Sequence, residues 1–184
     1  MISVNNLRSG VSFEEDGNIF KVVSFEHIKM GRGSANIKVK VRNLRSGSTT
    51  EKGYTNGAFV KDIYLEKKEF QFLYKDSVSA YFMDPRTFEQ LSVPISNLPG
   101  QEYLSEGGTV ILQFFGDEPI DLVLPPKVTI KVVETVPGTK GNSASNVYKD
   151  ATLENGIKTR VPLFIEEGDS IIVDTRDGGY TKRA

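Results

Sequence analysis

The sequence predicts an all-β protein, because strand-like runs are plentiful, helix-like periodicity is nearly absent, and turn residues separate the runs. Runs rich in β-branched and aromatic residues occur at residues 19–25, 37–41, 78–83, 110–115, 128–133 and 171–174. Short strands at such intervals are typical of small β-barrels and β-sandwiches. The one helix-like stretch is at residues 87–91, where we expect a turn or two at most.

Turn signals bound these runs in order along the chain. They are Asp16-Gly17, residues 43–47, Asp84-Pro85, Gly107-Gly108, Gly116-Asp117 and Pro137-Gly138. The pentapeptide NLRSG occurs twice, at residues 6–10 and 43–47. We interpret this repeat as one turn used twice at the exit of a strand, and not as a duplicated domain.

The distribution of charge divides the chain into three parts. Residues 1–63 carry ten Lys and Arg against six Asp and Glu, residues 64–127 carry five against ten, and residues 128–184 carry eight against eight. Pro125-Pro126 ends any strand at the second boundary, because a prolyl nitrogen cannot donate to a β-ladder. We therefore expect three domains of about 60 residues each, at 1–63, 64–127 and 128–184, whose small cores depend on their neighbours.

The composition excludes several classes of protein. The 184 residues are 38% hydrophobic and 26% charged, as in ordinary globular proteins. The chain has no cysteine, which excludes disulfides, thiolate metal sites and cysteine nucleophiles, and we expect a cytoplasmic location. No apolar run approaches the roughly 20 residues of a membrane span, and the N-terminus lacks the pattern of a secretory signal.

Residues 29–35, KMGRGSA, place Arg32 between two glycines. Glycine adopts positive φ without steric cost, so the segment predicts a hairpin tip. Residues 37–42 alternate apolar and basic, so one strand face would carry the basic residues Lys38, Lys40 and Arg42. Residues 29–52 hold seven Lys and Arg and a single acid, Glu51. A basic row of this kind can follow a phosphate backbone by counterion release, although a solvated face that discourages edge pairing is an alternative.

Local signals for catalysis are absent from the sequence. The only histidine, His27, has no second metal ligand at a suitable spacing, and no GxSxG, GxGxxG or GxxxxGK[ST] motif occurs. Arg32 can donate hydrogen bonds, stack or place a charge, but its guanidinium stays protonated and cannot transfer protons. The sequence predicts a binding protein with no metal or cofactor, and not an enzyme, although carboxylates distant in sequence could still meet as in a hydrolase.

The C-terminal third carries the most specific pattern. It reads KDATLENG at residues 149–156, VPLFI at 161–165, EGD at 167–169 and VDTRDGGY at 173–180. In this order and spacing the pattern resembles the C-terminal signature of bacterial elongation factor P. The resemblance extends to FMD and TFEQ at residues 82–84 and 87–90, and to GRG at residues 31–33.

The resemblance implies a fold and a function. The family has an N-terminal KOW-type (SH3-like) barrel followed by two OB-fold barrels in an elongated arrangement. The chain would be a monomeric translation elongation factor that binds both subunits of the ribosome, between the peptidyl-tRNA and exit sites. It would stimulate peptide-bond formation at proline-rich stalls by positioning the peptidyl-tRNA, with the ribosome as the catalyst.

The resemblance also assigns residues to the tip and its flanks. Arg32 would reach the CCA end of the peptidyl-tRNA from a tip that includes Met30, Gly31, Gly33 and Ser34. Family members commonly carry a modified basic residue there, either a lysine with a β-lysine-type extension or a rhamnosylated arginine. The residues around Arg32 match neither pattern fully, so its modification and a tip-modifying enzyme stay open. Contacts to the RNA backbone are expected from Lys29, Lys38, Lys40 and Arg42.

A second group of residues is implied to lie on the anticodon and mRNA side. Gly141, Asn142 and Ser143 match a Gly-Asp-Thr loop that approaches the exit-site codon in the family, but the carboxylate of that loop is replaced by an amide here. Tyr180 and Arg183 match an aromatic and a basic residue near the anticodon stem-loop of the tRNA.

Two other functions are compatible with the same residues. One is a paralogous ribosome-binding factor of the same fold with a different stall specificity, which an arginine tip would fit equally well. The other is a sequence-tolerant single-stranded nucleic-acid-binding OB protein, for which the middle part offers several aromatic residues. The acidic balance of residues 64–127 argues against the second alternative, because it repels a free strand.

Overall fold

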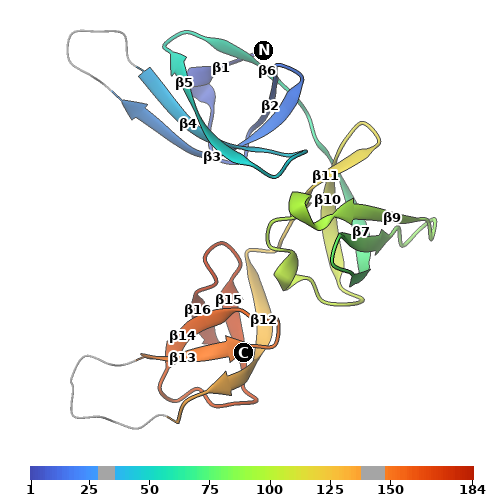
Figure 1. Cartoon of the computed structure of the whole chain (residues 1–184), viewed down its shortest axis with the longest axis vertical. Coiled ribbons are helices and arrows are strands. Elements are labelled where there is room, and N and C mark those ends of the chain that lie inside the picture. Colours follow the sequence, from blue (N-terminus) through green and yellow to red (C-terminus); the bar gives the residue numbers. More distant parts are fainter. Residues whose placement is uncertain (29–35, 138–147) are drawn as a thin grey trace. The chain divides into compact units, whose positions relative to one another are not determined.

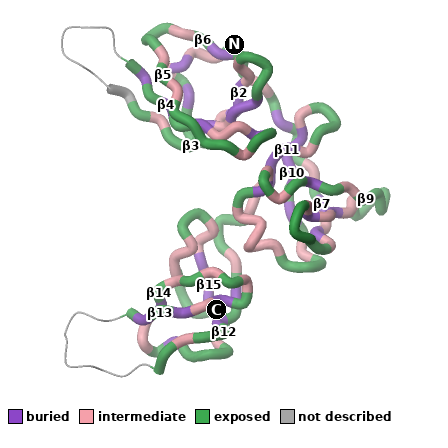
Figure 2. The backbone as a smooth tube through the Cα atoms, in the orientation of Figure 1, coloured by how far each residue is buried: buried purple, intermediate pink, exposed green. Residues whose placement is uncertain are grey.

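The computed structural model describes residues 1–28, 36–137 and 148–184. Within them, sixteen strands form three antiparallel sheets, and the only helices are three single 3-10 turns (Figure 1). The predicted all-β class is confirmed. Most buried residues lie on the strands, and most turn residues are exposed (Figure 2).

The first sheet has six strands in the order β1-β6-β2-β3-β4-β5. Its elements are β1 (Ile2–Ser3), η1 (Val4–Asn6), β2 (Ser12–Glu15), β3 (Asn18–Ile28), β4 (Asn36–Asn43), β5 (Thr49–Thr55) and β6 (Phe59–Asp62). Its core contains Leu7, Phe13 and Val39, all fully buried. The strands alternate in and out because successive side chains of a strand point to opposite faces.

The second sheet has five strands in the order β11-β10-β7-β8-β9. Its elements are β7 (Glu66–Lys75), β8 (Ser79–Met83), β9 (Gln90–Pro94), η2 (Ile95–Asn97), β10 (Thr109–Phe115) and β11 (Glu118–Val123). Aromatic pairs fill its interior: the rings of Phe70 and Phe114 lie 5.7 Å apart, and those of Phe72 and Phe82 lie 5.6 Å apart.

The helical turn expected at residues 87–91 is absent, so this prediction is wrong. Oδ1 of Asp84 accepts hydrogen bonds from the backbone N–H groups of Arg86 at 2.7 Å and Thr87 at 3.3 Å. Phe88 then adopts a left-handed backbone with φ of 60°. A side chain that competes for backbone N–H groups and a left-handed residue both stop a helix, so the segment forms the loop between β8 and β9.

The third sheet has five strands in the order β14-β13-β12-β15-β16. Its strands are β12 (Lys127–Thr135), β13 (Tyr148–Leu153), β14 (Lys158–Pro162), β15 (Ser170–Asp174) and β16 (Tyr180–Arg183). As Pro125-Pro126 predicted, no strand runs through this point: β11 ends before the prolines and β12 begins after them. The turn η3 (Gln101–Tyr103) belongs to residues 100–105, which group with this sheet, and Tyr103 packs against its core.

By compactness, the chain forms two units. Residues 1–99 and 106–123 form one unit, which contains the first and second sheets, and residues 100–105 and 124–184 form the other. Within the first unit, a small apolar cluster draws on both sheets; its buried members are Ile19, Leu44, Leu65 and Ile120. The division into domains at 1–63, 64–127 and 128–184 stays a prediction.

Candidate nucleic-acid interface

The segment predicted as a hairpin tip connects two long paired strands. β3 and β4 pair in antiparallel register from Phe20 opposite Asn43 to Ile28 opposite Asn36. Residues 29–35 join these strands and lie outside the described residues. The predictions that fall there concern Lys29, Met30, Gly31, Arg32, Gly33 and Ser34.

Strand β4 alternates as the sequence predicts. Its apolar residues are fully buried in the first core, whereas Lys38 and Lys40 between them are exposed. The register places Glu26 of β3 opposite Lys38, and Glu51 of β5 opposite Lys40. Exposed neighbours of opposite charge attract only weakly in water, so both ammonium groups remain accessible to a phosphate backbone.

Arg42 does not continue this exposed row. Its side chain is 12% exposed, and Nη2 lies 2.5 Å from Oδ1 of Asp121 on β11. Lys21, which faces Arg42 across the β3–β4 ladder, places Nζ 2.6 Å from Oδ2 of the same Asp121. The expectation that three cations line one solvent face is therefore corrected to two, Lys38 and Lys40, because the guanidinium of Arg42 is bound to a carboxylate of the second sheet.

Two further basic residues of the segment 29–52 are also paired. Nη2 of Arg45 lies 2.9 Å from Oε2 of Glu118, and Nζ of Lys52 forms an ion pair with Glu15. Nζ of Lys52 also lies 4.3 Å from the ring centroid of Phe20. Much of the basic character seen in the sequence therefore serves contacts within the protein.

The carboxylate of Glu15 has a second partner. The hydroxyl of Tyr54 donates to Oε2 of Glu15 at 3.2 Å. Burial of the phenol, followed by the charge and hydrogen bond of Glu15, raises the pKa of Tyr54 well above its ordinary value. The Tyr54 phenol therefore stays neutral beyond the pH at which an ordinary tyrosine ionises, and its hydrogen bond links β5 to β2.

The residues predicted for the anticodon side fall on or near the third sheet. β16 pairs with β15, and half-buried Tyr180 packs against the third core. Nη2 of Arg183 lies 2.6 Å from Oδ1 of Asp169, although 58% of its side chain stays exposed. The predictions for Gly141, Asn142 and Ser143 lie outside the described residues, in the segment that joins β12 to β13.

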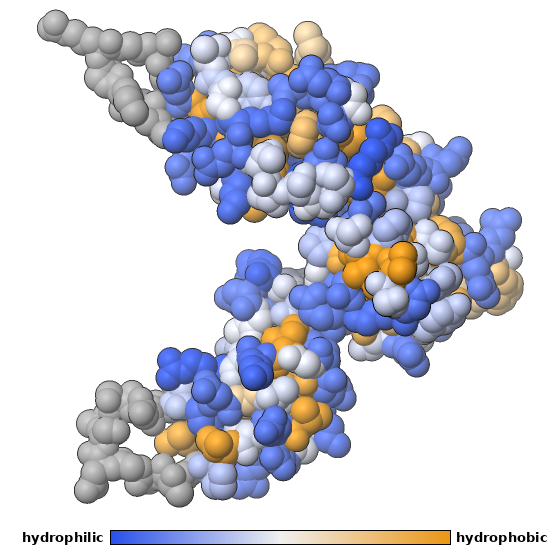
Figure 3. All heavy atoms as spheres, in the orientation of Figure 1, coloured by the Kyte–Doolittle hydropathy of each residue, from blue (hydrophilic) through white to orange (hydrophobic). Residues whose placement is uncertain are grey.

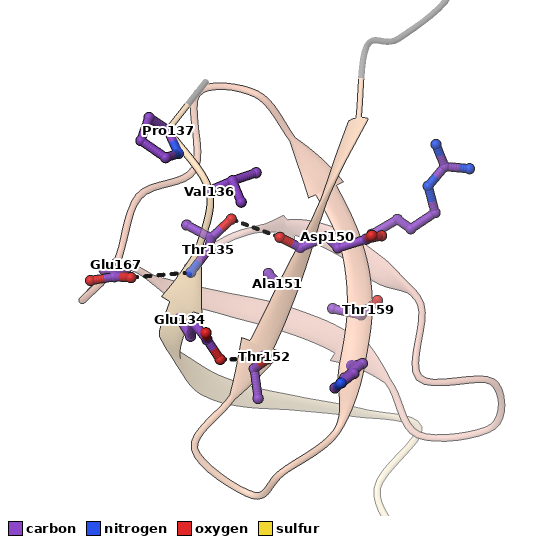
Figure 4. Close-up of a pocket in the computed structure, with 11 residues that line it drawn as sticks. Glu134, Thr135, Val136, Pro137, Asp150, Ala151, Thr152, Thr159 and Glu167 are labelled. Carbon is purple, nitrogen blue, oxygen red and sulfur yellow. Dashed lines mark hydrogen bonds between the residues drawn. The ribbon is translucent and has the colours of Figure 1, made fainter. Parts of the chain in front are cut away.

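A shallow depression of about 630 Å³ lies where β12, β13 and β14 run side by side (Figure 4). Its lining carries both signs of charge, and several of its polar groups bond one another. Thr135 donates its backbone N–H to Oε1 of Glu167 at 3.2 Å and its hydroxyl to the carbonyl oxygen of Asp150 at 2.8 Å. The depression therefore does not favour an anionic ligand over a cationic one. Sequence reasoning did not find it, because three strands contribute to it and no local motif marks it.

Exposed aromatic and aliphatic side chains occur in the regions of all three sheets, and Figure 3 shows hydrophobic surface in several places. Tyr64 is 85% exposed, and the loop residue Phe88 is 70% exposed. The rings of Tyr74 and Tyr81 stack on each other with centroids 4.5 Å apart. Because these two rings already stack together, they do not form the row of separate platforms that tolerant binding of single strands requires.

Two absences hold for residues 1–28, 36–137 and 148–184. No group of three or more His, Cys, Asp or Glu residues there could hold a metal ion. No helix there is long and apolar enough to cross a membrane.

Three family models match the chain in succession. "Elongation factor P (EF-P) KOW-like domain" matches residues 3–60, "Elongation factor P (EF-P) OB domain" matches residues 65–122, and "Elongation factor P, C-terminal" matches residues 128–183. Together with the three sheets, these matches define the class of the protein as a translation elongation factor built from a KOW-like barrel and OB-type barrels, and not an enzyme.

Relatives agree over the whole length. Proteins named Elongation factor P from Mesomycoplasma hyopneumoniae (strain 232) and Moorella thermoacetica are each 43% identical over 185 residues, and one from Thermus thermophilus is 42% identical over 184. Each alignment covers 100% of both chains. The chain therefore belongs to the elongation factor P family. The resemblance, the fold class and the absence of enzymatic activity predicted from the sequence are confirmed, and association with the ribosome follows from the family.

A solved structure is also similar, at a lower level. "Eukaryotic translation initiation factor 5A from Methanococcus jannaschii" aligns with a TM-score of 0.49 and 23% identity, over 66% of this chain and 90% of that one. A similarity at this level supports no statement about fold or function.

Proposed function

We propose that this elongation factor binds the ribosome between the peptidyl-tRNA and exit sites and stimulates peptide-bond formation at proline-rich stalls. The supporting observation is the β3–β4 hairpin, whose paired strands lead to the segment that contains Arg32 and whose outer face presents Lys38 and Lys40. A hairpin with exposed cations suits a narrow channel lined with phosphate, because each neutralised phosphate releases counterions.

The mechanism we propose is positional. Arg32 donates hydrogen bonds to phosphate or ribose near the CCA end of the peptidyl-tRNA and exchanges no proton. Proline is a constrained nucleophile, so its attack on the peptidyl ester depends on alignment. Holding the ester in a near-attack geometry lowers the entropic part of the barrier, and the ribosome remains the catalyst.

The partners proposed follow from the same arrangement. They are both ribosomal subunits, the peptidyl-tRNA, and mRNA at the exit site through the segment with Asn142. Tyr180 and Arg183 would lie toward the anticodon stem-loop, and the exposed part of the Arg183 guanidinium supports such a contact. We further propose that the protein acts in the cytoplasm as a monomer, and that Arg32 is the residue on which a tip-modifying enzyme would act.

The test uses reconstituted translation of a message with three consecutive proline codons and of a matched message without them. We expect Arg32→Ala to abolish the relief of the stall while leaving the fold intact, because the substitution leaves the described core residues untouched. Arg86→Ala is the matched control, since Arg86 is exposed and lies in the loop between β8 and β9. Full relief by Arg32→Ala, or no relief by the unaltered chain, would contradict the proposal. Intact mass and peptide mapping of protein from its native cell would show whether Arg32 carries a modification.

A further inference from the structure

The feature with the clearest unassigned role is a buried carboxylate between the first two sheets. Asp121 on β11 is 1% exposed, and it binds two cations that face each other across the base of the β3–β4 hairpin. We propose that Asp121 is a positioning residue, through which the second sheet fixes the direction of the hairpin that carries Arg32. This inference deepens the proposed function and rests on it for its functional part.

The two cations explain why the carboxylate is required. Lys21 and Arg42 are directly opposite each other in the ladder, where two like charges repel. Each oxygen of Asp121 binds one of them, since Oδ1 accepts from Arg42 at 2.5 Å and Oδ2 accepts from Lys21 at 2.6 Å. Nζ of Lys21 also donates to Oε1 of Gln113 at 3.1 Å, and Gln113 pairs with Asp121 across β10 and β11. The carboxylate therefore offsets one of the two positive charges and reduces the repulsion between Lys21 and Arg42.

Burial makes this ion triad sensitive to geometry. A dry carboxylate is stable only when its partners stay within hydrogen-bond distance, because water cannot replace a partner that moves away. Both cations belong to the first sheet and the carboxylate belongs to the second. A change in the angle between the two sheets would break at least one of the bonds, so the triad favours a single orientation.

Neighbouring contacts in the same unit support a fixed orientation. The buried side chains of Ile19, Leu44 and Ile120 pack together from both sheets. A Cβ added at Gly47 would lie 2.3 Å from the backbone oxygen of Ser96, so the turn after β4 touches the backbone of η2. Domain interfaces in one chain are mobile by default unless they are well packed. This one combines an apolar cluster, a close backbone approach and an ion triad around a buried carboxylate.

Because the hairpin is long, a small change in its direction at the base produces a large displacement at its far end. From Lys21 to Ile28 the strand advances about 23 Å, at roughly 3.3 Å per residue. A tilt of about 10° at the base would displace the far end by about 4 Å over that length. A displacement of about 1 Å can already lower the rate of a reaction that depends on positioning roughly a hundredfold. The contacts of Asp121 with Lys21 and Arg42 therefore decide whether the hairpin can position the peptidyl-tRNA.

The structural arm of the test measures orientation in the full chain. Because the protein has no cysteine, Ser24→Cys on β3 and Ser92→Cys on β9 provide two exposed positions for spin labels. We expect a narrow distance distribution in the parent and at least a twofold broader one in Asp121→Asn. Glu118→Gln is the control, because it removes an exposed ion pair between the same two sheets, and it should leave the width unchanged. Arg42→Gln removes the triad from the opposite side and should broaden the distribution if Asp121→Asn fails to fold.

The functional arm uses the proline-stall assay at saturating factor. We expect Asp121→Asn to lose at least tenfold in the rate of stalled peptide-bond formation, and Asp121→Glu to recover part of it. A narrow distance distribution in both Asp121→Asn and Arg42→Gln would contradict the proposal that Asp121 fixes the direction of the hairpin. A broad distribution with full stall relief would overturn the positioning role. If the parent protein itself relieves no stall, the proposed function fails, while the distance measurement still decides whether Asp121 sets the orientation.

Discussion

The repeated pentapeptide NLRSG provides a matched pair of substitutions. Gly10 and Gly47 end its two copies, and both have a left-handed backbone, with φ of 90° and 73°. A Cβ at Gly10 would meet nothing within 4 Å, whereas a Cβ at Gly47 would lie 2.3 Å from the oxygen of Ser96. We expect Gly10→Ala to strain only its own turn, and Gly47→Ala to strain its turn and also push the first two sheets apart.

The size of the difference follows from the geometry. Left-handed backbone costs an L-residue about 1–2 kcal/mol, and this applies at both positions. At Gly47 the contact must also lengthen by about 1 Å, to the 3.4 Å of ordinary contact. A gap of that size forfeits roughly a quarter to a half of the local dispersion energy. Applied to the four buried residues of the apolar cluster that contains Leu44, each worth about 1.5–3 kcal/mol, this adds at least about 1.5 kcal/mol for Gly47→Ala alone.

Native-state hydrogen exchange can report the two sites separately. The N–H of Leu44 donates to the carbonyl oxygen of Ile19 at 2.8 Å, and both residues belong to the apolar cluster shared by the first two sheets. The N–H of Val22 donates to the carbonyl oxygen of Val11 at 2.8 Å in the first sheet region. Since about 1.4 kcal/mol is a factor of ten, Gly47→Ala should speed exchange at Leu44 at least about tenfold more than Gly10→Ala does. Equal acceleration at Leu44 by the two variants would refute the idea that Gly47 is required for close packing of the sheets.

Three further predictions concern surface charge, pH and a buried amine. Reversing Lys38 and Lys40 to Glu together should weaken ribosome binding and reduce the salt slope of log affinity by about 2, in binding titrations over KCl. Because folding raises the pKa of Tyr54, its phenol ionises above about pH 10 in the unfolded chain before it does so in the folded one, and stability falls as pH rises there. Tyr54→Phe should remove this loss of stability in denaturation measurements at alkaline pH. Lys149→Met should cost about 1–3 kcal/mol in thermal melts, because the carbonyl of Val136 loses its bond from Lys149 at 2.7 Å.

Each of these predictions has a control and a contradicting result. Lys67→Glu changes an exposed lysine of the second sheet. An equal reduction of the salt slope by this variant would show that the slope depends on the net charge of the protein and not on Lys38 and Lys40. Tyr64→Phe alters a phenol that is 85% exposed, so alkaline sensitivity removed by that variant instead would contradict the assignment to Tyr54. Lys158→Met changes an exposed lysine of β14, and equal destabilisation by it would show that burial of Lys149 is irrelevant.

Strand positions were predictable because alternation and turn chemistry act locally. The buried set on β4 follows directly from the period of two in the sequence. The loop at residues 87–91 was not predictable by the same reasoning, because a capping side chain at Asp84 and the left-handed Phe88 override a weak helical pattern. The two copies of NLRSG also differ: the second begins at the last residue of β4, whereas the first begins at the last residue of η1 and not at a strand end.

The charge row was only partly predictable. Spacing alone places Lys38, Lys40 and Arg42 on one face, and nothing local distinguishes the third from the first two. What separates Arg42 is Asp121, which is 79 residues away and approaches only when the second sheet packs. A signal for Asp121 does exist in hindsight, since it is the single acid inside the apolar run at residues 119–124. An acid on a strand with apolar neighbours on both sides indicates a buried partner of opposite charge.

The placement of residues 100–105 has a consequence for recombination between homologues. This short segment lies between β9 and β10 in sequence, yet it groups with the C-terminal unit, and Tyr103 packs on that unit's core. The chain therefore passes from one compact unit to the other three times and not once. A crossover at residue 127 would combine Tyr103 from one parent with the core of the C-terminal unit from the other. A chimera that exchanges the C-terminal unit must therefore also exchange residues 100–105.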